Sequence, residues 1–200
     1  MTIYVESNFV LELALLQEQH ESCRRVVSAC STGRAQLALP AFCIAETYEA
    51  LGRRSQERGR LGGELKREIK QLSRSKSYQR EAQGLPDVDA LLDRSAREDA
   101  IRLRRALKQI LRVAEIIPLN ASVLVPSPRF PALSPQDSIV CFSVLHHLKG
   151  SADAPACFLT RNRSAFEGRA LRDALARRGC KLFLDFAHGW QYIAHEIGRT

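Results

Sequence analysis

The chain alternates short β-branched or apolar runs with longer segments in which apolar residues recur at helical spacing. Strands that alternate with helices are typical of a parallel sheet covered by helices on both faces. The sequence therefore predicts an α/β protein, a three-layer fold with a central parallel sheet. The expected strands are Thr2 to Val5, Gln36 to Leu39, Ile116 to Leu119, Ala156 to Thr160 and Lys181 to Leu184.

Helical patterns fill the segments between these strands and follow the last one. The best marked helix has Ser134 as its cap, Pro135 in the first turn and an acid, Asp137, at the third position, and it runs to about Lys149. Four prolines between Pro126 and Pro135 predict an irregular loop before it. The other expected helices begin near Phe9 and Phe186 or cover Glu18 to Cys30, Ala41 to Leu51 and Ser164 to Arg178.

Length and composition favour one compact domain over residues 1–200. The chain has 200 residues, of which 45% are hydrophobic and 26% charged, as in ordinary globular proteins. We find no run of about 18 apolar residues that could cross a bilayer. The first apolar segment contains Glu6, Asn8 and Glu12 and has no basic leader before it. We therefore expect a cytoplasmic protein without a membrane partner.

The six cysteines lie far apart and mostly within apolar runs. They form no Cys-x-x-Cys pair, and the tight pair His146 and His147 has no ligand partner nearby in the sequence. A structural zinc ion needs about four ligands in tetrahedral arrangement. We therefore expect reduced core thiols and no zinc site.

The positive charge of the chain is concentrated in one segment. Residues 53–112 contain 17 basic and 9 acidic residues, whereas the rest of the chain has 13 of each. Two long helical patterns cover this segment and separate at Gly84-Leu85-Pro86, after which Asp87 can cap the second helix. We expect a basic helical hairpin inserted at about residues 52–115. A basic surface attracts nucleic acid, although a solvated helical face would show the same charges.

Polar residues follow the predicted strands where the crevice of an open parallel sheet is expected. Glu6 follows the first strand, Asn162 the fourth and Asp185 the fifth, while Glu46 and Asp137 lie on helices. Each has an ordinary explanation when taken alone, as a solvated turn residue, a surface residue or a helix cap. For Asp185 the cap is the favoured interpretation, and His188 is expected to be a structural residue of the last helix.

Four segments that carry these residues occur in a fixed order: Ile3-Tyr4-Val5-Glu6-Ser7-Asn8, Glu46 in its apolar helix, Leu133 to Val140, and Phe158 to Phe166. Together they resemble the four signature blocks of the PIN-domain ribonuclease family. The resemblance covers most of the chain outside the segment from about Leu51 to Glu115. It implies a PIN-like fold in which acidic side chains at one end of the sheet hold Mg²⁺ or Mn²⁺ for hydrolysis of RNA phosphodiester bonds.

The resemblance also implies roles for individual residues. Glu6, Glu46 and Asp137 stand where the family has acidic metal ligands, so they are the predicted metal-binding and catalytic residues. Asn162 stands where a fourth acid is common and is the predicted auxiliary, either through its carbonyl oxygen or through a hydrogen bond to a metal-bound water. Hard cations such as Mg²⁺ prefer oxygen ligands and keep several waters, so two or three carboxylates suffice to hold one.

Neighbouring polar and basic residues complete the predicted site. The supporting residues are Ser7, Asn8 and Thr160. The residues expected to contact RNA phosphates are Arg161, Arg163, Arg53, Arg54, Arg102 and Arg105. With Trp190 as its one tryptophan, the chain is not expected to offer a broad stacking platform for bases.

The predicted function is metal-dependent cleavage of RNA, and the resemblance extends to the toxins of toxin-antitoxin pairs. An antitoxin protein and a homodimer are therefore the further partners to consider. Two other interpretations stay open. One is a noncatalytic RNA-binding or scaffold protein that keeps the fold, and the other is a basic helical interaction protein that binds no metal.

Overall fold

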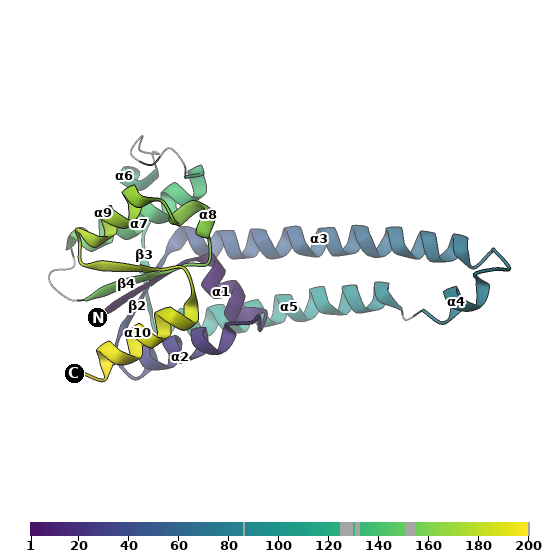
Figure 1. Cartoon of the computed structure of the whole chain (residues 1–200), viewed down its shortest axis with the longest axis horizontal. Helices are drawn as coiled ribbons and strands as arrows, with labels where there is room; N and C mark the ends of the chain where they lie inside the picture. Colours follow the sequence, from purple (N-terminus) through teal and green to yellow (C-terminus); the bar gives the residue numbers. More distant parts are fainter. Residues whose placement is uncertain (86, 125–129, 131–132, 151–154, 200) are drawn as a thin grey trace. The chain divides into compact units, whose positions relative to one another are not determined.

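A computed structural model of the chain describes residues 1–85, 87–124, 130, 133–150 and 155–199 (Figure 1). Most of the loop predicted between Pro126 and Pro135 lies outside the described residues. The chain divides into two compact units. Unit 1 comprises residues 1–47 and 103–200, and unit 2 comprises residues 48–102. The predicted insertion at 52–115 thus overlaps unit 2, while residues 103–115 belong to unit 1.

Unit 1 is built on a five-stranded sheet in which all neighbouring strands are parallel, as the alternating pattern predicts. The strand order is β3-β2-β1-β4-β5. All four residues of β1 and of β4 are buried, which agrees with their almost wholly apolar sequences and with a sheet covered on both faces. The strands are β1 Thr2–Val5, β2 Gln36–Pro40, β3 Ala114–Ile117, β4 Ala156–Leu159 and β5 Cys180–Phe183.

The third strand begins two residues earlier than predicted and ends at Ile117. Its register is set by pairing with β2, where Ala114 lies opposite Leu37. Pro118 has no backbone N–H to donate, so the ladder stops before it. The prediction of Ile116 to Leu119 was therefore wrong in its bounds, since it counted hydrophobicity rather than pairing.

Helices cover both faces of the sheet in unit 1. Figure 1 shows α1, α2 and α10 on one face and α6, α7 and α9 on the other. One T-shaped ring pair, Phe9 against Phe186, joins α1 to α10 on the first face, and another, Phe158 against Phe166, joins β4 to α8 on the second. These helices are α1 Ser7–Ala14, α2 His20–Ser31, α6 Ala121–Leu124, α7 Pro135–Gly150, α8 Arg163–Phe166, α9 Arg169–Ala176 and α10 Phe186–Ile197.

Two predicted helices have other bounds in the structure. The segment from Ser164 to Arg178 forms two helices, α8 and α9, because Gly168 adopts an extended backbone conformation as the N-cap of α9. The helix expected to end at Leu51 continues without a break as α3, Ala41–Leu72. Strong helix formers dominate its sequence, and they carry the helix through its internal glycines.

Unit 2 consists of the rest of α3, the short helix α4 Gln79–Gln83 and the first part of α5 Val88–Ile110. Asp87 caps α5, as predicted, because its Oδ1 accepts a hydrogen bond from the N–H of Ala90 at 3.0 Å. Arg58 and Asp99 form an ion pair at 2.7 Å inside this unit, and Asp99 is buried. None of the described helices in either unit is both long and apolar enough for a membrane span.

The strand order places a topological switch point in the middle of the sheet. From β1 the chain moves outward to β2 and β3, and it then returns to β4 on the other side of β1. The helices that follow β1 and β4 consequently lie on opposite faces (Figure 1). In open parallel sheets, such a point opens a crevice outside the carboxyl ends of the strands. Here those strand ends lead directly to Glu6 and Thr160.

Candidate active site

Glu6 lies at the end of β1 and is 4% exposed. Its carboxylate accepts hydrogen bonds from the hydroxyls of Thr160 at 2.9 Å and Ser7 at 3.1 Å. Burial raises the pKa of Glu6, and the polar groups of Thr160, Asn8 and Ser7 oppose this shift. An acid that is buried at a strand end with hydroxyl donors around it is not a solvated turn residue. The supporting positions predicted for Ser7, Asn8 and Thr160 all lie beside this carboxyl group.

Thr160 links Glu6 to Asn162. Its hydroxyl donates to Glu6 and accepts from the backbone N–H of Asn162 at 2.9 Å. The side-chain amide of Asn162 in turn donates to Oδ1 of Asp137 at 2.9 Å. Residues from the first strand, the fourth strand and helix α7 are thereby joined in one hydrogen-bonded chain. The predicted residues Glu6, Asp137 and Asn162 therefore converge at the carboxyl edge of the sheet.

The orientation of the Asn162 amide is fixed by its neighbours. Its Oδ1 accepts from the backbone N–H of Ala165 at 3.2 Å and from the hydroxyl of Ser164 at 2.9 Å. A backbone N–H needs an acceptor, so the oxygen must face Ala165 and the NH₂ group must face Asp137. Asn162 thus acts as the cap of α8 and as a donor to Asp137. In this arrangement its carbonyl oxygen accepts two hydrogen bonds, so ligation of a cation by that oxygen would require their release.

Asp137 is held in place from its other side by the cap of α7. Ser134 donates its hydroxyl to Oδ2 of Asp137 at 2.6 Å and accepts from the Asp137 backbone N–H at 3.1 Å. This reciprocal pair is the predicted serine cap with an acid at the third position. It fixes Asp137 in the first turn of α7 with both carboxylate oxygens engaged by hydrogen-bond donors.

Glu46 lies in the part of α3 that belongs to unit 1 and is half-buried. Burial raises its pKa to about 7, the nearby hydroxyl of Ser7 opposes the shift, and the charges of Glu6 and Asp137 raise it further. Glu46 therefore lies near enough to Glu6 and Asp137 for both charges to raise its pKa. A carboxyl group with a pKa near neutral pH, in a crevice beside two other acids, is a typical feature of functional sites.

These oxygen donors fit a hard divalent cation in chemistry and charge. Glu6, Glu46 and Asp137 offer carboxylates, and a cation among them would relieve the repulsion that raises the pKa of Glu46. Among the described residues, however, no three His, Cys, Asp or Glu side chains are placed as a ready ligand set for one ion. Binding by all three carboxylates would therefore need side-chain rotation from this arrangement.

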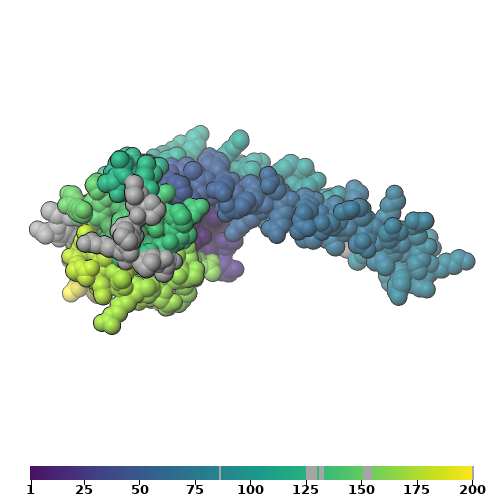
Figure 2. Space-filling view, turned by 90° about the horizontal axis from the view of Figure 1, so that it is seen from above, coloured from purple at the N-terminus to yellow at the C-terminus, as the bar shows by residue number. Residues whose placement is uncertain are grey.

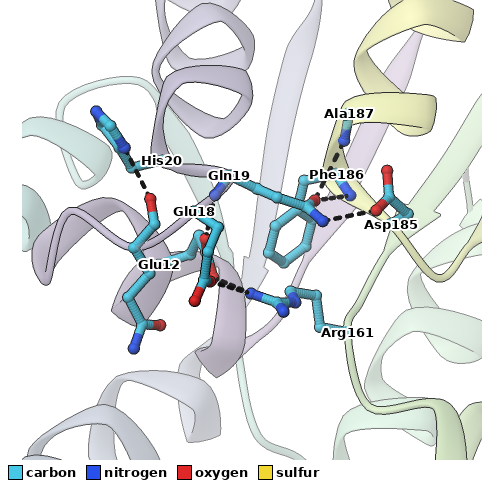
Figure 3. Close-up of polar contacts among 9 residues, drawn as sticks. Glu12, Glu18, Gln19, His20, Arg161, Asp185, Phe186 and Ala187 are labelled. Carbon is cyan, nitrogen blue, oxygen red and sulfur yellow. Dashed lines mark hydrogen bonds and ion pairs between the residues drawn. The ribbon is translucent and has the colours of Figure 1, made fainter.

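Arg161 lies beside the crevice, and its guanidinium is held by two acids. It donates to Glu12 at 2.7 Å and to Glu18 at 3.1 Å (Figure 3). Glu12 is 1% exposed, and sequence reasoning did not identify it as a partner of Arg161. The one signal was an acid within the apolar run from Phe9 to Ala14. Because both partners offset its charge, Arg161 has less capacity to contact phosphate than the exposed Arg163.

A second network in the same region ties α2 to α10. Gln19 donates its amide to Asp185 at 2.6 Å and accepts from the backbone N–H groups of Phe186 and Ala187 (Figure 3). Asp185 also accepts from the N–H of His188 at 2.9 Å, which confirms the predicted cap of the last helix. This network is structural, and the His188 side chain is 74% exposed.

The other predicted RNA-contacting arginines are divided between the units. Arg53 and Arg102 lie in unit 2 and form ion pairs, the first with Glu49 and the second with Glu98 at 3.1 Å. Arg54 also belongs to unit 2, whereas Arg105 belongs to unit 1 and is exposed. Ion pairs therefore neutralise part of the charge of unit 2, while Arg163 is exposed and follows Asn162 directly in the sequence.

All six cysteines are free and buried, which confirms that they are core residues. No model of a protein family matches the chain, and no curated protein or solved structure is significantly similar to it. The fold and the site together define an α/β protein with a cluster of acids at the switch point of a parallel sheet.

Proposed function

We propose that this chain is a metal-dependent endoribonuclease of PIN type that acts on RNA in the cytoplasm. One observation carries the proposal. Glu6, Glu46 and Asp137 lie together at the carboxyl edge of the sheet. Thr160 and Asn162 link Glu6 to Asp137 by hydrogen bonds, and the charges of these two acids raise the pKa of Glu46. This is the convergence that the resemblance to PIN-domain ribonucleases implies.

In this proposal Glu6, Glu46 and Asp137 hold Mg²⁺ or Mn²⁺. The ion, when bound, supplies the Lewis acid that phosphodiester hydrolysis requires. The chain's own residues prepare the site for it. Thr160 and Ser7 orient the Glu6 carboxylate, and Asn162 and Ser134 orient that of Asp137. Pre-orientation of this kind keeps the carboxylates from turning away into solvent.

Glu46 has a second role in the proposal. With a pKa of about 7, it holds a proton for part of the time at neutral pH. Side chains with pKa values near the working pH are the most effective proton acceptors and donors. Glu46 is therefore suited both to exchange its proton for the cation and to accept a proton at the edge of the site. In the same proposal Arg163, which is exposed and follows Asn162 in the sequence, contacts the phosphate backbone of RNA.

Cleavage of end-labelled single-stranded RNA tests the proposal. The purified protein should cut it internally with Mg²⁺ or Mn²⁺ and leave it intact in EDTA. Asp137→Asn should reduce the rate by about a hundredfold or more, since the carboxylate would be removed with little change of shape. Asp93→Asn, an exposed site in unit 2, is the matched control and should cut like the unchanged protein. Equal activity of the two variants would refute the assignment.

A second function is favoured by one specific observation. Asn162 brings no charge, and its carbonyl oxygen is occupied by Ser164 and Ala165. A site with three acids in place of four also suits a protein that binds RNA without cutting it. Such a protein would retain RNA in EDTA and show no cleavage with any divalent ion. A cognate antitoxin and a homodimer remain predictions, for which size measurement of the purified and co-expressed proteins is the direct check.

A further inference from the structure

A cavity of about 650 Å³ lies in unit 1 among α6, α7 and α9, and Glu6, Glu46 and Asp137 do not line it. Figure 2 looks onto the face of unit 1 that these helices form. Along α7 the lining residues are spaced at three and four positions, at Phe142, Leu145, His146 and Lys149, so one helical face forms one wall. The volume is within the range of about 300 to 1,000 Å³ typical of small-molecule sites.

The floor of the cavity is apolar and partly aromatic. Val123, Leu145 and Ala174 are buried. The rings of Phe130 and Phe142 also line it, with their centroids 5.6 Å apart and their planes tilted by 38°. Both phenylalanines are partly exposed, so ring surface is accessible at this site. A flat ring system is the kind of ligand that such a floor holds best, because aromatic faces attract one another when offset or tilted.

The rim of the cavity is cationic. Lys149, Arg177 and Arg178 line it against one acid, Asp173. The side chains of Lys149 and Arg177 are exposed and make no hydrogen bond or ion pair with any described residue, whereas the Arg178 side chain donates to the carbonyl of Ala174 at 3.0 Å. A net positive rim selects for an anion, and lysine and arginine bind phosphate, as they bind carboxylate, through charge-assisted hydrogen bonds.

Helix ends offer an alternative explanation for these cations, since basic residues in a last turn offset the helix dipole. Arg178 does this through its bond to Ala174. That role does not require the cations of two helices to share one cavity, and it does not account for two partly exposed phenylalanines beside them. The combination of ring surface and positive charge that no described residue pairs with is explained by a ligand that carries both an aromatic ring and an anion.

We infer that this cavity binds a nucleotide unit, with the base against Phe130 and Phe142 and the phosphate at Lys149 and Arg177. The same chemistry is found in a free nucleoside monophosphate and in one residue of an RNA strand. The inference does not depend on the acid cluster, because none of the residues of that cluster lines the cavity. It therefore stands or falls separately from the proposed nuclease activity.

Fluorescence titrations of the full chain in EDTA test the inference. The probes are a fluorescent etheno derivative of adenosine 5′-monophosphate and a labelled single-stranded RNA of about ten nucleotides, a length comparable to what single-strand binding domains cover. EDTA removes any contribution from metal-dependent binding or cleavage. Saturable binding of the mononucleotide identifies a free nucleotide as a ligand, whereas binding of RNA alone identifies a nucleotide within a strand. Both results support the inference.

Substitutions at three places show whether the bound probe occupies this cavity. Lys149→Gln combined with Arg177→Gln should weaken binding by about tenfold or more, because the variant cannot form two charge-assisted hydrogen bonds to the phosphate. Phe142→Leu should weaken nucleotide binding about fivefold, while competition by inorganic phosphate should change by less than about twofold. Arg172→Gln is the matched control on α9, since Arg172 is exposed and neither it nor its ion-pair partner Glu167 lines the cavity.

Two results would overturn the inference. One is the absence of saturable binding of either probe up to millimolar concentration. The other is equal binding by the double variant and by Arg172→Gln, with circular dichroism showing that both are folded. Because Lys149 and Arg177 are exposed, their substitution leaves the core packing unchanged and a negative result is interpretable. Saturable binding of an acidic peptide in place of both nucleotide probes would likewise overturn it.

Discussion

The pKa of Glu46 reflects the negative charge of the acids around it. Its folded-state pKa is about 7 against 4.5 in the absence of the fold, because of burial and the charges of Glu6 and Asp137. A folded state that holds more protons than the unfolded state loses stability as pH rises. For Glu46 this loss spans pH 4.5 to about 7, and the full cost is present above it. A cation at the site removes the same cost.

We therefore predict that Glu46→Gln stabilises the metal-free protein at pH 8 and leaves its stability nearly unchanged at pH 4.5. The expected gain at pH 8 is about 2 kcal/mol, smaller than the full shift implies because water screens a half-buried group. Urea unfolding in EDTA at both pH values measures it. Glu167→Gln, an exposed glutamate, is the control and should change stability by less than about 0.5 kcal/mol at either pH. A gain at pH 4.5 as large as at pH 8 would contradict the charge cluster.

Asn162 permits a second test at a single atom pair. Asn162→Asp keeps an acceptor for the N–H of Ala165 and replaces the donor to Asp137 by a charged oxygen. At neutral pH the metal-free variant should be destabilised by about 2 kcal/mol, the cost of removing a charge-assisted hydrogen bond. Millimolar Mn²⁺ should restore most of this stability, since the variant has an added ligand charge. Urea unfolding with and without Mn²⁺ measures both effects, and a variant as stable as the parent in EDTA would contradict the hydrogen bond.

Among the elements, α10 packs closely on the sheet at Gly189. A Cβ atom there would lie 2.5 Å from Cδ2 of Leu159 and 3.5 Å from Cβ of Phe183. Leu159 is fully buried in β4, so it has little room to move. Glycine thus allows α10 to pack directly on the sheet beside the crevice.

We predict opposite effects for alanine at two helical glycines. Gly189→Ala should destabilise the protein by about 1 to 3 kcal/mol through overpacking against Leu159. Gly59→Ala in α3 has no atom within 4 Å of the new Cβ and should stabilise its helix by about 0.5 to 1 kcal/mol. Thermal unfolding followed by circular dichroism measures both. A neutral Gly189→Ala would show that the packing of α10 is looser than the structure indicates.

The sequence predicts elements where the signal is local, and misses what depends on pairing. The start of α7 is predicted correctly from Ser134, Pro135 and Asp137, because a helix cap depends on neighbouring residues alone. The same signal places Asp137 in the first turn. The bounds of β3 depend on its pairing with Leu37, which is far away in the sequence, so hydrophobicity alone misplaced them. The division of α8 from α9 depends on Gly168, and a single glycine does not interrupt the apolar spacing from which a continuous helix was predicted.

The acidic residues of the site could be predicted from the sequence, but their hydrogen-bond partners could not. Strand ends and helix starts drew attention to Glu6, Glu46 and Asp137, and the parallel topology explains why such positions meet. The amide orientation of Asn162 follows from Ser164 and Ala165 only once α8 is formed. The burial of Glu12 against Arg161 joins α1 to the end of β4, an interaction that no local pattern encodes.

In the complete chain, two units share the positive charge. Unit 2 has 13 basic and 10 acidic residues, and several of these form ion pairs with each other. The described acid cluster, in contrast, lies within unit 1. We therefore expect the chemistry to reside in unit 1 and unit 2 to contribute to RNA affinity through its unpaired basic side chains.

Replacement of residues 48–102 by a short glycine-serine linker tests this division. Unit 1 should retain its fold and its Mn²⁺ affinity, because Glu6, Glu46 and Asp137 all remain. RNA affinity should fall, and its dependence on salt should become shallower by about 0.7 in slope for each RNA phosphate that unit 2 no longer neutralises. Circular dichroism and binding titrations at several salt concentrations measure this. Failure of a folded variant to bind Mn²⁺ would show that the site extends into unit 2.

The proposed function depends above all on one divalent cation shared by Glu6, Glu46 and Asp137 at the carboxyl edge of the sheet. Anomalous diffraction from a crystal grown with Mn²⁺ locates such an ion without reference to activity. We predict a single strong manganese peak in contact with carboxylate oxygens of all three residues, and no peak in Asp137→Asn. A crystal of the folded protein saturated with Mn²⁺ that has no peak at these three side chains would refute the shared site.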